Sequence, residues 1–253
     1  MPIAPAVTVA VPSFNQGRYL AAALESVFSQ DVAVEVWVLD GGSTDETAEV
    51  IRRWEPRLAG WRSGKDAGQA AAINEGISRG TAPYVCWLNS DDWLEPGALA
   101  RLVAELDAHP GAPFAYGRAW NHVDTTGARK PVVMVREWSA RAMANFCIVP
   151  QPSTLIRRSA WEAVGGVDGS LHMAMDYDLW WRLYRKFGAP RFIDDFLSTN
   201  REHGGTKTKN LRRAHYREAI AVVRKHYGRV PLKWYLAQPY TVWWWGLKAK
   251  LGL

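Results

Sequence analysis

Short apolar runs alternate with amphipathic stretches along the first half of the chain. The runs at residues 7–11 and 34–39 are apolar and rich in β-branched side chains, the run at 84–88 is apolar throughout, and each ends in polar or glycine-rich residues. This pattern predicts buried strands. After the first two runs, apolar residues recur at helical spacing: Leu20, Leu24, Val27, Phe28, Val50, Ile51, Trp54 and Leu58. Alternating strands and helices predict a mostly parallel sheet covered by helices on both faces.

Capping signals set the expected limits of the helices. A capping box at residues 43–46 predicts that a helix begins there, and Gly80 ends a helix expected over residues 69–79. Pro96 suits the first turn of the next helix. Similar signals in the second half predict strands at residues 114–118 and 131–135. They also predict a helix opened by a second capping box at residues 159–162, before Gly165, and two helices ended by glycine, at residues 176–187 and 207–227.

The carboxyl ends of the predicted strands carry the candidate chemistry, because ligands of parallel sheets bind there. Asp91 and Asp92 follow the strand at residues 84–88, and two adjacent carboxylates repel each other. A hard divalent cation such as Mg²⁺ or Mn²⁺ would relieve that repulsion and bridge to substrate phosphates. The alternative is that one of the two caps the helix near Pro96. On the pair alone, both interpretations stay open.

Other strand ends favour the binding interpretation. Asp40 closes the second strand, and Asp66 precedes Gly68 just before the helix at residues 69–79. Aspartates at these places could accept hydrogen bonds from a nucleobase or ribose, and glycine lets the backbone approach a ligand closely. Together with residues 12–15, polar groups stand at four successive strand or loop exits, which helix capping alone explains poorly.

At this point the chain resembles the family 2 glycosyltransferases, which have the GT-A fold: a Rossmann-like, mostly parallel sheet flanked by helices. The resemblance covers roughly residues 7–205 and rests on five segments in the family's order, at residues 11–15, 39–45, 66–69 with Asn74, 87–92 and 175–180. It implies inverting, metal-dependent transfer of a sugar from a nucleotide-diphosphate donor, with a UDP-sugar favoured. The acceptor would be a saccharide or lipid-linked saccharide in cell-surface polysaccharide or glycolipid synthesis.

The resemblance also implies roles for individual residues. The donor nucleotide would be bound by Pro12, Ser13, Asn15, Asp40, Asp66, Gly68, Gln69, Asn74 and Asp91. Asp91 and Asp92, with His203 as an additional candidate, would hold Mn²⁺ or Mg²⁺. Gln151 and Lys207 would contact the acceptor or the diphosphate.

Asp176 is the candidate general base, because it matches the aspartate of the family's Glu-Asp pair at the start of the helix at 176–187. Asp178 is the rival, and simple helix capping is the alternative for either. The sequence departs from the common pattern at two positions, Met175 in place of Glu and Asn89 in place of Asp. These departures keep open a non-catalytic carbohydrate- or membrane-binding protein that retains the fold.

Charge is distributed unevenly along the 253 residues. Residues 201–253 hold twelve Lys or Arg against two Glu, so the first 200 residues have a net charge of −4 in a chain of net charge +6. We expect one globular unit in which residues 1–205 form the GT-A domain, with a nucleotide-sugar half at about 1–110 and an acceptor half at about 111–205. Residues 206–253 would form a basic, aromatic, helical C-terminal extension.

The aromatic and basic residues of 232–253 suit a segment that rests on an anionic membrane surface or packs on a protein, and the sequence does not choose between them. No apolar run reaches about 18 residues, so we expect a cytoplasmic protein, peripheral on the inner face of the cell membrane if the tail binds lipid. The two cysteines, Cys86 and Cys147, predict buried packing.

Other functions fit less well. A sugar nucleotidyltransferase would have a glycine-rich, arginine-bearing loop after the first strand, and residues 12–17 do not supply it. NAD-binding and P-loop signatures are missing from the sequence. The basic tail is not accompanied by a recognisable nucleic-acid-binding module, so no nucleic-acid partner is expected.

Overall fold

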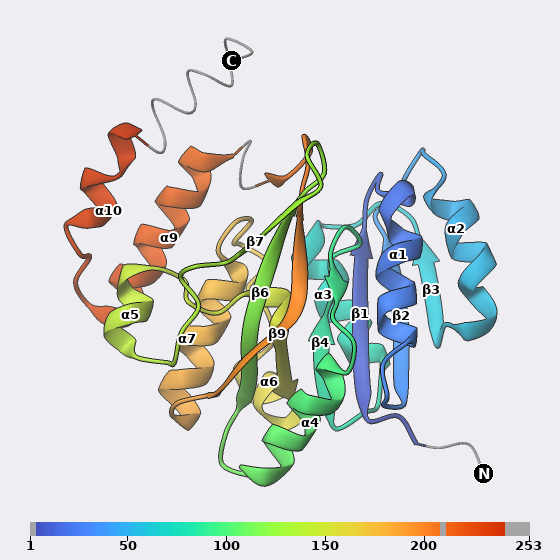
Figure 1. Cartoon of the computed structure of the whole chain (residues 1–253), viewed down its shortest axis with the longest axis horizontal. Coiled ribbons are helices and arrows are strands. Elements are labelled where there is room, and N and C mark those ends of the chain that lie inside the picture. The colour runs from blue at the N-terminus through green and yellow to red at the C-terminus, as the bar shows by residue number, and fades with distance from the viewer. Residues whose placement is uncertain (1–3, 208–210, 241–253) are drawn as a thin grey trace.

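The computed structural model describes residues 4–207 and 211–240 (Figure 1). In this part of the chain, nine strands form one sheet with the order β3-β2-β1-β4-β8-β6-β9-β5, and β7 pairs with β6. The strands are β1 (Val7–Ser13), β2 (Val34–Asp40), β3 (Gly60–Ser63), β4 (Tyr84–Trp87), β5 (Trp93–Leu94), β6 (Phe114–Val123), β7 (Ala128–Pro131), β8 (Thr154–Arg157) and β9 (Arg191–Glu202). The helices are α1 (Gly17–Phe28), α2 (Thr47–Trp54), α3 (Gln69–Arg79), α4 (Ala98–Ala108), α5 (Ala140–Asn145), α6 (Arg158–Val164), α7 (Met175–Phe187), α9 (Arg212–Tyr227) and α10 (Lys233–Leu236).

The predicted parallel half of the sheet is confirmed. β3, β2, β1 and β4 are neighbours and all run parallel. Every residue of β1 and β4 is buried, because helices cover both faces of this half, which is why these strands read as continuous apolar runs. The polar residues that follow β1, β2 and β4 therefore meet at one edge of the sheet.

The helix predicted over residues 69–79 is confirmed in both limits as α3, and the predicted helix at 176–187 is confirmed as α7, ended by Gly188. Both predicted capping boxes are wrong. α2 begins at Thr47, and the Asp45 carboxylate accepts hydrogen bonds from the backbone N–H groups of Thr47 and Gly17, which ties α2 to α1. α6 begins at Arg158, one residue before the expected Ser cap. In both cases contacts with other elements override the local signal.

Residues around Pro96 also differ from the prediction. α4 begins at Ala98 after Gly97, whose φ of 69° lies in the left-handed region, so Pro96 stands outside the helix. The two residues before Glu95 form the short strand β5, which the sequence did not predict and which pairs antiparallel with β9.

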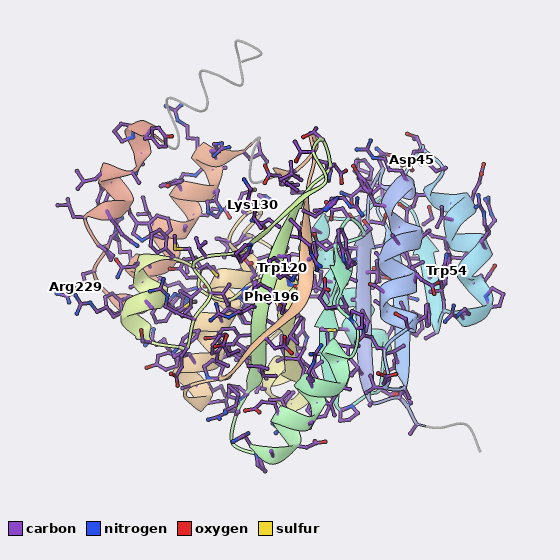
Figure 2. All side chains as sticks on the ribbon, viewed as in Figure 1. Asp45, Trp54, Trp120, Lys130, Phe196 and Arg229 are labelled. Atoms are coloured by element: carbon purple, nitrogen blue, oxygen red, sulfur yellow. The ribbon has the colours of Figure 1, made fainter. Side chains whose placement is uncertain are left out.

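The second half of the sheet is built from long strands that the sequence underestimated. β6 and β9 pair in parallel over nine register positions with an irregularity at Gly117–Ala119. Trp120 and Phe196 stack across the pair with ring centres 3.8 Å apart (Figure 2). The strand predicted at residues 131–135 is wrong, because β7 ends at Pro131 and a turn follows.

In the described part of the predicted C-terminal extension, α9 packs against α7 and α5 (Figure 1). α9 ends at Gly228, as predicted, and contributes Ala219, Val222 and Val223 to the same core cluster as α7. Trp234 of α10 is also buried there and donates its indole N–H to the Ala144 carbonyl at 2.8 Å. Among the residues described, no helix has the length and apolar content needed to cross a membrane.

Candidate active site

A cavity of about 1570 Å³ lies along the carboxyl ends of β1, β2 and β4 and continues to α7, α9 and α10. It gathers most of the residues predicted from the sequence: Pro12, Ser13, Asp66, Gly68, Gln69, Asp91, Asp92, Gln151, Asp176 and Lys207. Five others, Asn15, Asp40, Asn74, Asp178 and His203, are not among the lining residues. Residues from both halves of the chain therefore face one space.

The end of the cavity at which the sequence predicts nucleotide binding is formed by the loops after β1 and β2 and before α3. The Ser13 hydroxyl is buried and has no hydrogen-bond partner within the described chain, so it can serve a ligand. The Asp66 carboxylate pairs with Arg62 at 3.0 Å and accepts the Gly68 N–H at 2.8 Å. Lys207 donates to the Gln69 side chain at 2.7 Å and so brings a cation over this end.

Asp40 and Asn15 support this end of the cavity without lining it. The fully buried Asp40 carboxylate accepts the Ser43 backbone N–H at 3.1 Å and the hydroxyls of Ser43 and Ser63. The Asn15 side chain accepts the Thr44 N–H at 2.9 Å, and its φ of 52° is the one left-handed non-glycine value among the described residues. Asn15 thus ties the loop after β1 to the loop after β2, and Asp40 ties the loop after β2 to the end of β3.

Asn74 has a different partner from the one predicted. Its side chain exchanges two hydrogen bonds with the backbone of Val167, at 2.9 and 3.0 Å. These bonds attach α3 to the loop after α6, and the contact of Asn74 with the donor stays a prediction.

The acid pair lies at the centre of the cavity. Asp91 Oδ2 accepts hydrogen bonds from Gln16 at 3.1 Å and lies 2.9 Å from His203 Nε2. Asp92 Oδ1 accepts the backbone N–H of Arg201 at 2.9 Å, and burial together with the Asp91 charge raises the pKa of Asp92 to about 8. Neither aspartate caps α4, so the capping interpretation of the pair is wrong.

The donor set fits a divalent cation that is completed by substrate. The described residues contain no group of three His, Cys, Asp or Glu side chains arranged as a ready-made metal site. Asp91 and His203 nonetheless lie 2.9 Å apart, and the charge of Asp91 raises the pKa of the adjacent Asp92. Mg²⁺ and Mn²⁺ typically use one or two carboxylates and take their remaining ligands from phosphates and water. A nucleoside diphosphate in the cavity would supply those ligands.

Asp176 faces the cavity from the first turn of α7. Its Oδ1 accepts the Tyr177 N–H at 2.8 Å, and burial raises the pKa of Asp176 to about 6, so the carboxylate is ionised yet basic near neutral pH.

Asp178 has a contrasting environment. It is fully buried away from the cavity and accepts hydrogen bonds from Arg182, Lys225 and His226 at 2.6, 2.9 and 2.7 Å. These bonds hold the pKa of Asp178 well below its ordinary value. A carboxylate in this setting is a weak proton acceptor.

Gln151, which comes shortly before β8, is hydrogen-bonded to the end of β4 and to the loop that follows it. Its amide donates to the Trp87 carbonyl at 2.7 Å, and its oxygen accepts from Asn89 at 3.3 Å. Asn89, at the position where the family pattern has an acid, also donates to Asp92 at 3.1 Å. An amide at residue 89 therefore stabilises the Asp92 carboxylate.

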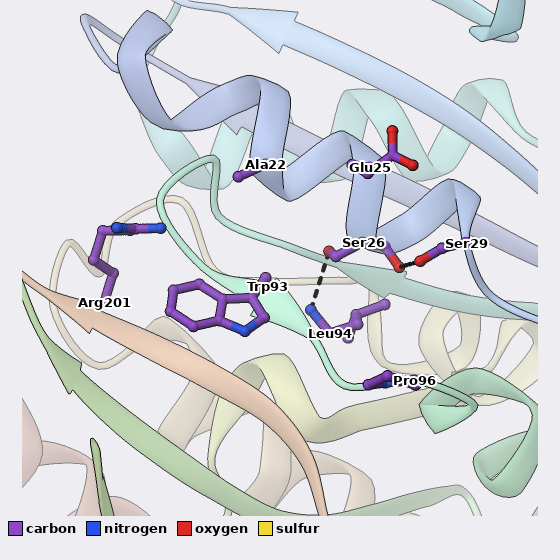
Figure 3. Close-up of a pocket in the computed structure, with 8 residues that line it drawn as sticks. All are labelled: Ala22, Glu25, Ser26, Ser29, Trp93, Leu94, Pro96 and Arg201. Carbon is purple, nitrogen blue, oxygen red and sulfur yellow. Dashed lines mark hydrogen bonds between the residues drawn. The ribbon is translucent and has the colours of Figure 1, made fainter. Parts of the chain in front are cut away.

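Sequence reasoning missed Arg201, which organises the acid pair. Its backbone N–H donates to the Asp92 carboxylate, its Nε donates to the Asp91 carbonyl at 3.0 Å, and its guanidinium pairs with Asp124 at 2.8 Å. Its position two residues before His203 was the one available signal. Arg201 also lies over the Trp93 ring, 4.8 Å from its centre, in a second pocket of about 390 Å³ between α1 and β5 (Figure 3). That pocket holds none of the predicted residues.

The opposite end of the cavity also contains residues that the sequence did not single out as ligand contacts. α9, α10 and the residue after α10 contribute Arg212, His215, Tyr216, Ala219, Lys233, Trp234 and Ala237. The predicted C-terminal extension therefore forms part of the cavity wall. Residues 241–253, with Trp243, Trp244, Trp245, Lys248 and Lys250, lie outside the described residues.

The chain is similar in sequence to known glycosyltransferases and polysaccharide synthases. The sequence model of a family described as glycosyl transferase family 2 matches residues 8–163, more than half of the chain. Chondroitin synthase of Escherichia coli is 25% identical over 250 residues, which are 94% of this chain and 35% of that protein. Hyaluronan synthase of Pasteurella multocida is 27% identical over 185 residues, 71% of this chain and 19% of that protein. The chain thus spans little more than a third of these relatives at most.

Solved structures resemble the fold. Staphylococcus aureus TarS (residues 1–349) in complex with UDP-GlcNAc superposes with a TM-score of 0.69 at 18% identity, over 87% of this chain and 66% of that one. The mannosyltransferase PcManGT from Pyrobaculum calidifontis, in complex with GDP-Man and Mn²⁺, superposes with a TM-score of 0.65 at 21% identity, over 87% and 65%. These neighbours are GT-A glycosyltransferases, so the predicted fold class is confirmed.

Proposed function

Because the chain belongs to glycosyl transferase family 2, as its sequence motifs predicted, we propose that it transfers a sugar with inversion from a nucleotide-diphosphate donor to a hydroxyl acceptor. The observation that supports this most is one cavity lined by both the acid pair at Asp91 and the separate carboxylate of Asp176. The polysaccharide synthases among the relatives favour a role in polysaccharide or glycolipid synthesis.

The donor would lie across the ends of β1, β2 and β4. We assign its nucleoside to Pro12, Ser13, Asp66 and the loop at Gly68, and its diphosphate to the neighbourhood of Asp91 and Lys207. Asp91, Asp92 and His203 would hold Mn²⁺ or Mg²⁺, which stabilises the charge that develops on the departing diphosphate. A UDP-sugar is favoured because TarS was solved with UDP-GlcNAc, and the Mn²⁺ bound to the mannosyltransferase favours that ion.

Asp176 would act as the base. As the bond between the sugar and the diphosphate breaks, the acceptor hydroxyl forms the new glycosidic bond and its proton passes to the Asp176 carboxylate. Its pKa of about 6 suits this role, because the group is unprotonated at neutral pH yet accepts a proton readily. Gln151 would keep the donor and acceptor ends in register through its bonds to Trp87 and Asn89.

Residues 1–110 would thus bind the donor, residues 111–205 would bind the acceptor, and α9 and α10 would complete the acceptor wall. Leu232, Tyr235, Leu236 and Tyr240 are exposed, which supports contact of the C-terminal extension with a membrane surface. Cosedimentation with vesicles of anionic lipid, compared with vesicles of neutral lipid, tests that part. Equal recovery of the protein with both would contradict the electrostatic contribution of its Lys and Arg residues.

A donor screen tests the proposal. UDP-, GDP- and dTDP-sugars are added with and without Mn²⁺, and the true donor should raise the melting temperature in a metal-dependent way, since a ligand of the native state stabilises it by mass action. Turnover should release nucleoside diphosphate. Release of pyrophosphate would indicate a sugar nucleotidyltransferase, and donor binding without hydrolysis or transfer to any acceptor would indicate a non-catalytic protein.

A further inference from the structure

Three consecutive backbone N–H groups converge on one side chain from the C-terminal extension. Glu218, on α9, accepts hydrogen bonds at a single carboxylate oxygen from His172 at 3.1 Å, Met173 at 2.8 Å and Ala174 at 3.1 Å. Glu218 is separated from this loop by more than forty residues of sequence. The carboxylate is therefore a long-range tie and not a local helix cap.

The tie acts on the segment that leads into α7. Ala174 is the residue that precedes α7, and its N–H has no partner within the helix itself. Successive N–H groups that point to one spot form a concave anion site, and a carboxylate is the strongest acceptor that the chain can offer it. Without Glu218, these three amides would lose the acceptor that fixes the loop conformation.

The same segment forms the acceptor wall of the cavity. Residues 172–176 all line it, and Asp176 comes two residues after Ala174. A second tie holds α9 to α7 just beyond, where Lys225 and His226 donate to Asp178 at 2.9 and 2.7 Å. α9 is thus fastened to α7 on both sides of the turn that carries Asp176.

We propose that Glu218 is a positioning residue that fixes the loop at residues 172–174, and through it Asp176, against the bound acceptor. The proposal rests on the function proposed above. Glu218 touches no reacting atom in this scheme; it sets the placement of the base and of the wall on which the acceptor lies. A small displacement of such a group is enough to slow a reaction by about 10²-fold.

Two variants and a control test this role in the full chain. Glu218→Ala removes all three bonds, Glu218→Gln keeps an oxygen that can accept them, and Glu162→Ala removes an exposed carboxylate from α6, which also packs on α7. Three quantities are measured for each protein: donor affinity, hydrolysis of the donor by water, and kcat/KM for the acceptor.

For Glu218→Ala we expect kcat/KM for the acceptor to fall about 10²-fold, while donor affinity stays within about threefold of the wild type and donor hydrolysis falls less than transfer, because water is not held by the loop at residues 172–174. Glu218→Gln should recover most of the loss but stay about five- to tenfold below the wild type, because an uncharged acceptor is weaker but correctly placed. Glu162→Ala should behave as the wild type. The ratio of hydrolysis to transfer would then rise most in Glu218→Ala, less in Glu218→Gln, and would stay unchanged in Glu162→Ala.

Equal losses of donor hydrolysis and acceptor transfer in both Glu218 variants would show a purely structural role and overturn the proposal. Wild-type acceptor kinetics in Glu218→Ala would overturn it too. If Glu218→Ala does not fold, the test is the comparison of kcat/KM for the acceptor between Glu218→Gln and Glu162→Ala. Equal values in these two proteins would overturn the proposal. Failure of the proposed function is a separate result, because the wild-type protein itself would then transfer no sugar.

Discussion

The donor end and the acceptor end of the cavity are built in different ways. The donor end consists of loops that directly follow β1, β2 and β4 or precede α3, so its residues come in chain order from one parallel sheet. The acceptor end combines the first turn of α7 with residues of α9 and α10, which lie far away in sequence. A parallel sheet therefore places donor groups by topology alone, whereas the acceptor groups depend on ties between helices. Substitutions at the donor end and at the acceptor end should therefore impair sugar transfer in different ways.

The largest effect is expected at the donor end. Asp91→Asn should reduce transfer by about 10³-fold or more and abolish metal-dependent donor binding, because the side chain next to His203 loses the charge that is proposed to hold the cation. Titration calorimetry with donor and Mn²⁺ measures the binding. Asp31→Asn, an exposed aspartate of the same half, serves as the matched control. Undiminished metal-dependent donor binding in Asp91→Asn would remove Asp91 from the site.

At the acceptor end, Asp176→Asn should separate binding from chemistry. Transfer is expected to fall by about 10²- to 10⁴-fold, the range that general-base catalysis contributes, while donor affinity stays unchanged. Steady-state kinetics and the same calorimetric titration provide the two readouts. Asp168→Asn, in the loop between α6 and α7, is the control for a neighbouring carboxylate. Full turnover in Asp176→Asn would assign the base to another residue.

Asp178→Asn should destabilise the fold. The cationic side chains of Arg182 and Lys225, together with His226, surround this buried carboxylate, and removal of its charge should lower the free energy of unfolding by about 3 kcal/mol. Denaturant unfolding measures the change, and transfer per folded molecule should stay close to that of the wild type. Unchanged stability together with lost transfer would make Asp178 the base and contradict the contrast drawn between the two aspartates.

The pH dependence gives the smallest effect. The base acts in its unprotonated form, and the pKa of Asp176 is raised by burial to about 6. We therefore expect kcat/KM for the acceptor to be constant above about pH 7 and to fall about tenfold per pH unit below about pH 6. A rate profile with the donor saturating checks this, and donor affinity over the same range shows whether the metal site contributes. A profile that stays flat down to pH 5 would exclude Asp176.

The sequence predicted the donor half well because the signals there are local. Apolar runs and the polar residues that follow them located β1, β2 and β4, and Gly80 marked the end of α3. Where a polar side chain bonds to a distant element, local rules failed: Asp45 ties α2 to α1 and does not cap a helix that starts at residue 43. β9 could not be predicted, since eight of its twelve residues are polar and its register on β6 is set by tertiary pairing.

The same distinction applies to the site. A rule about strand ends is enough to select Ser13, Asp66 and Asp91 for the cavity. It is not enough to recognise Arg201, whose contacts with the acid pair come from β9, or Glu218, whose three partners lie before α7. Such residues become visible only when the folded chain brings separate segments together.

The burial of α9 against α7 matters for protein engineering. Ala219, Val222 and Val223 belong to the core cluster that includes Trp180 and Leu183, so a fragment that stopped near residue 205 would expose an apolar face of the helix that carries Asp176. Chimeric transferases that exchange acceptor specificity should therefore move α7 and α9 as one cassette, with Glu218 and its three amides taken from the same parent. A junction near β2 and β3 is a safer place to recombine, because no residue of these two strands belongs to that core cluster, whereas α3 and β4 do contribute to it.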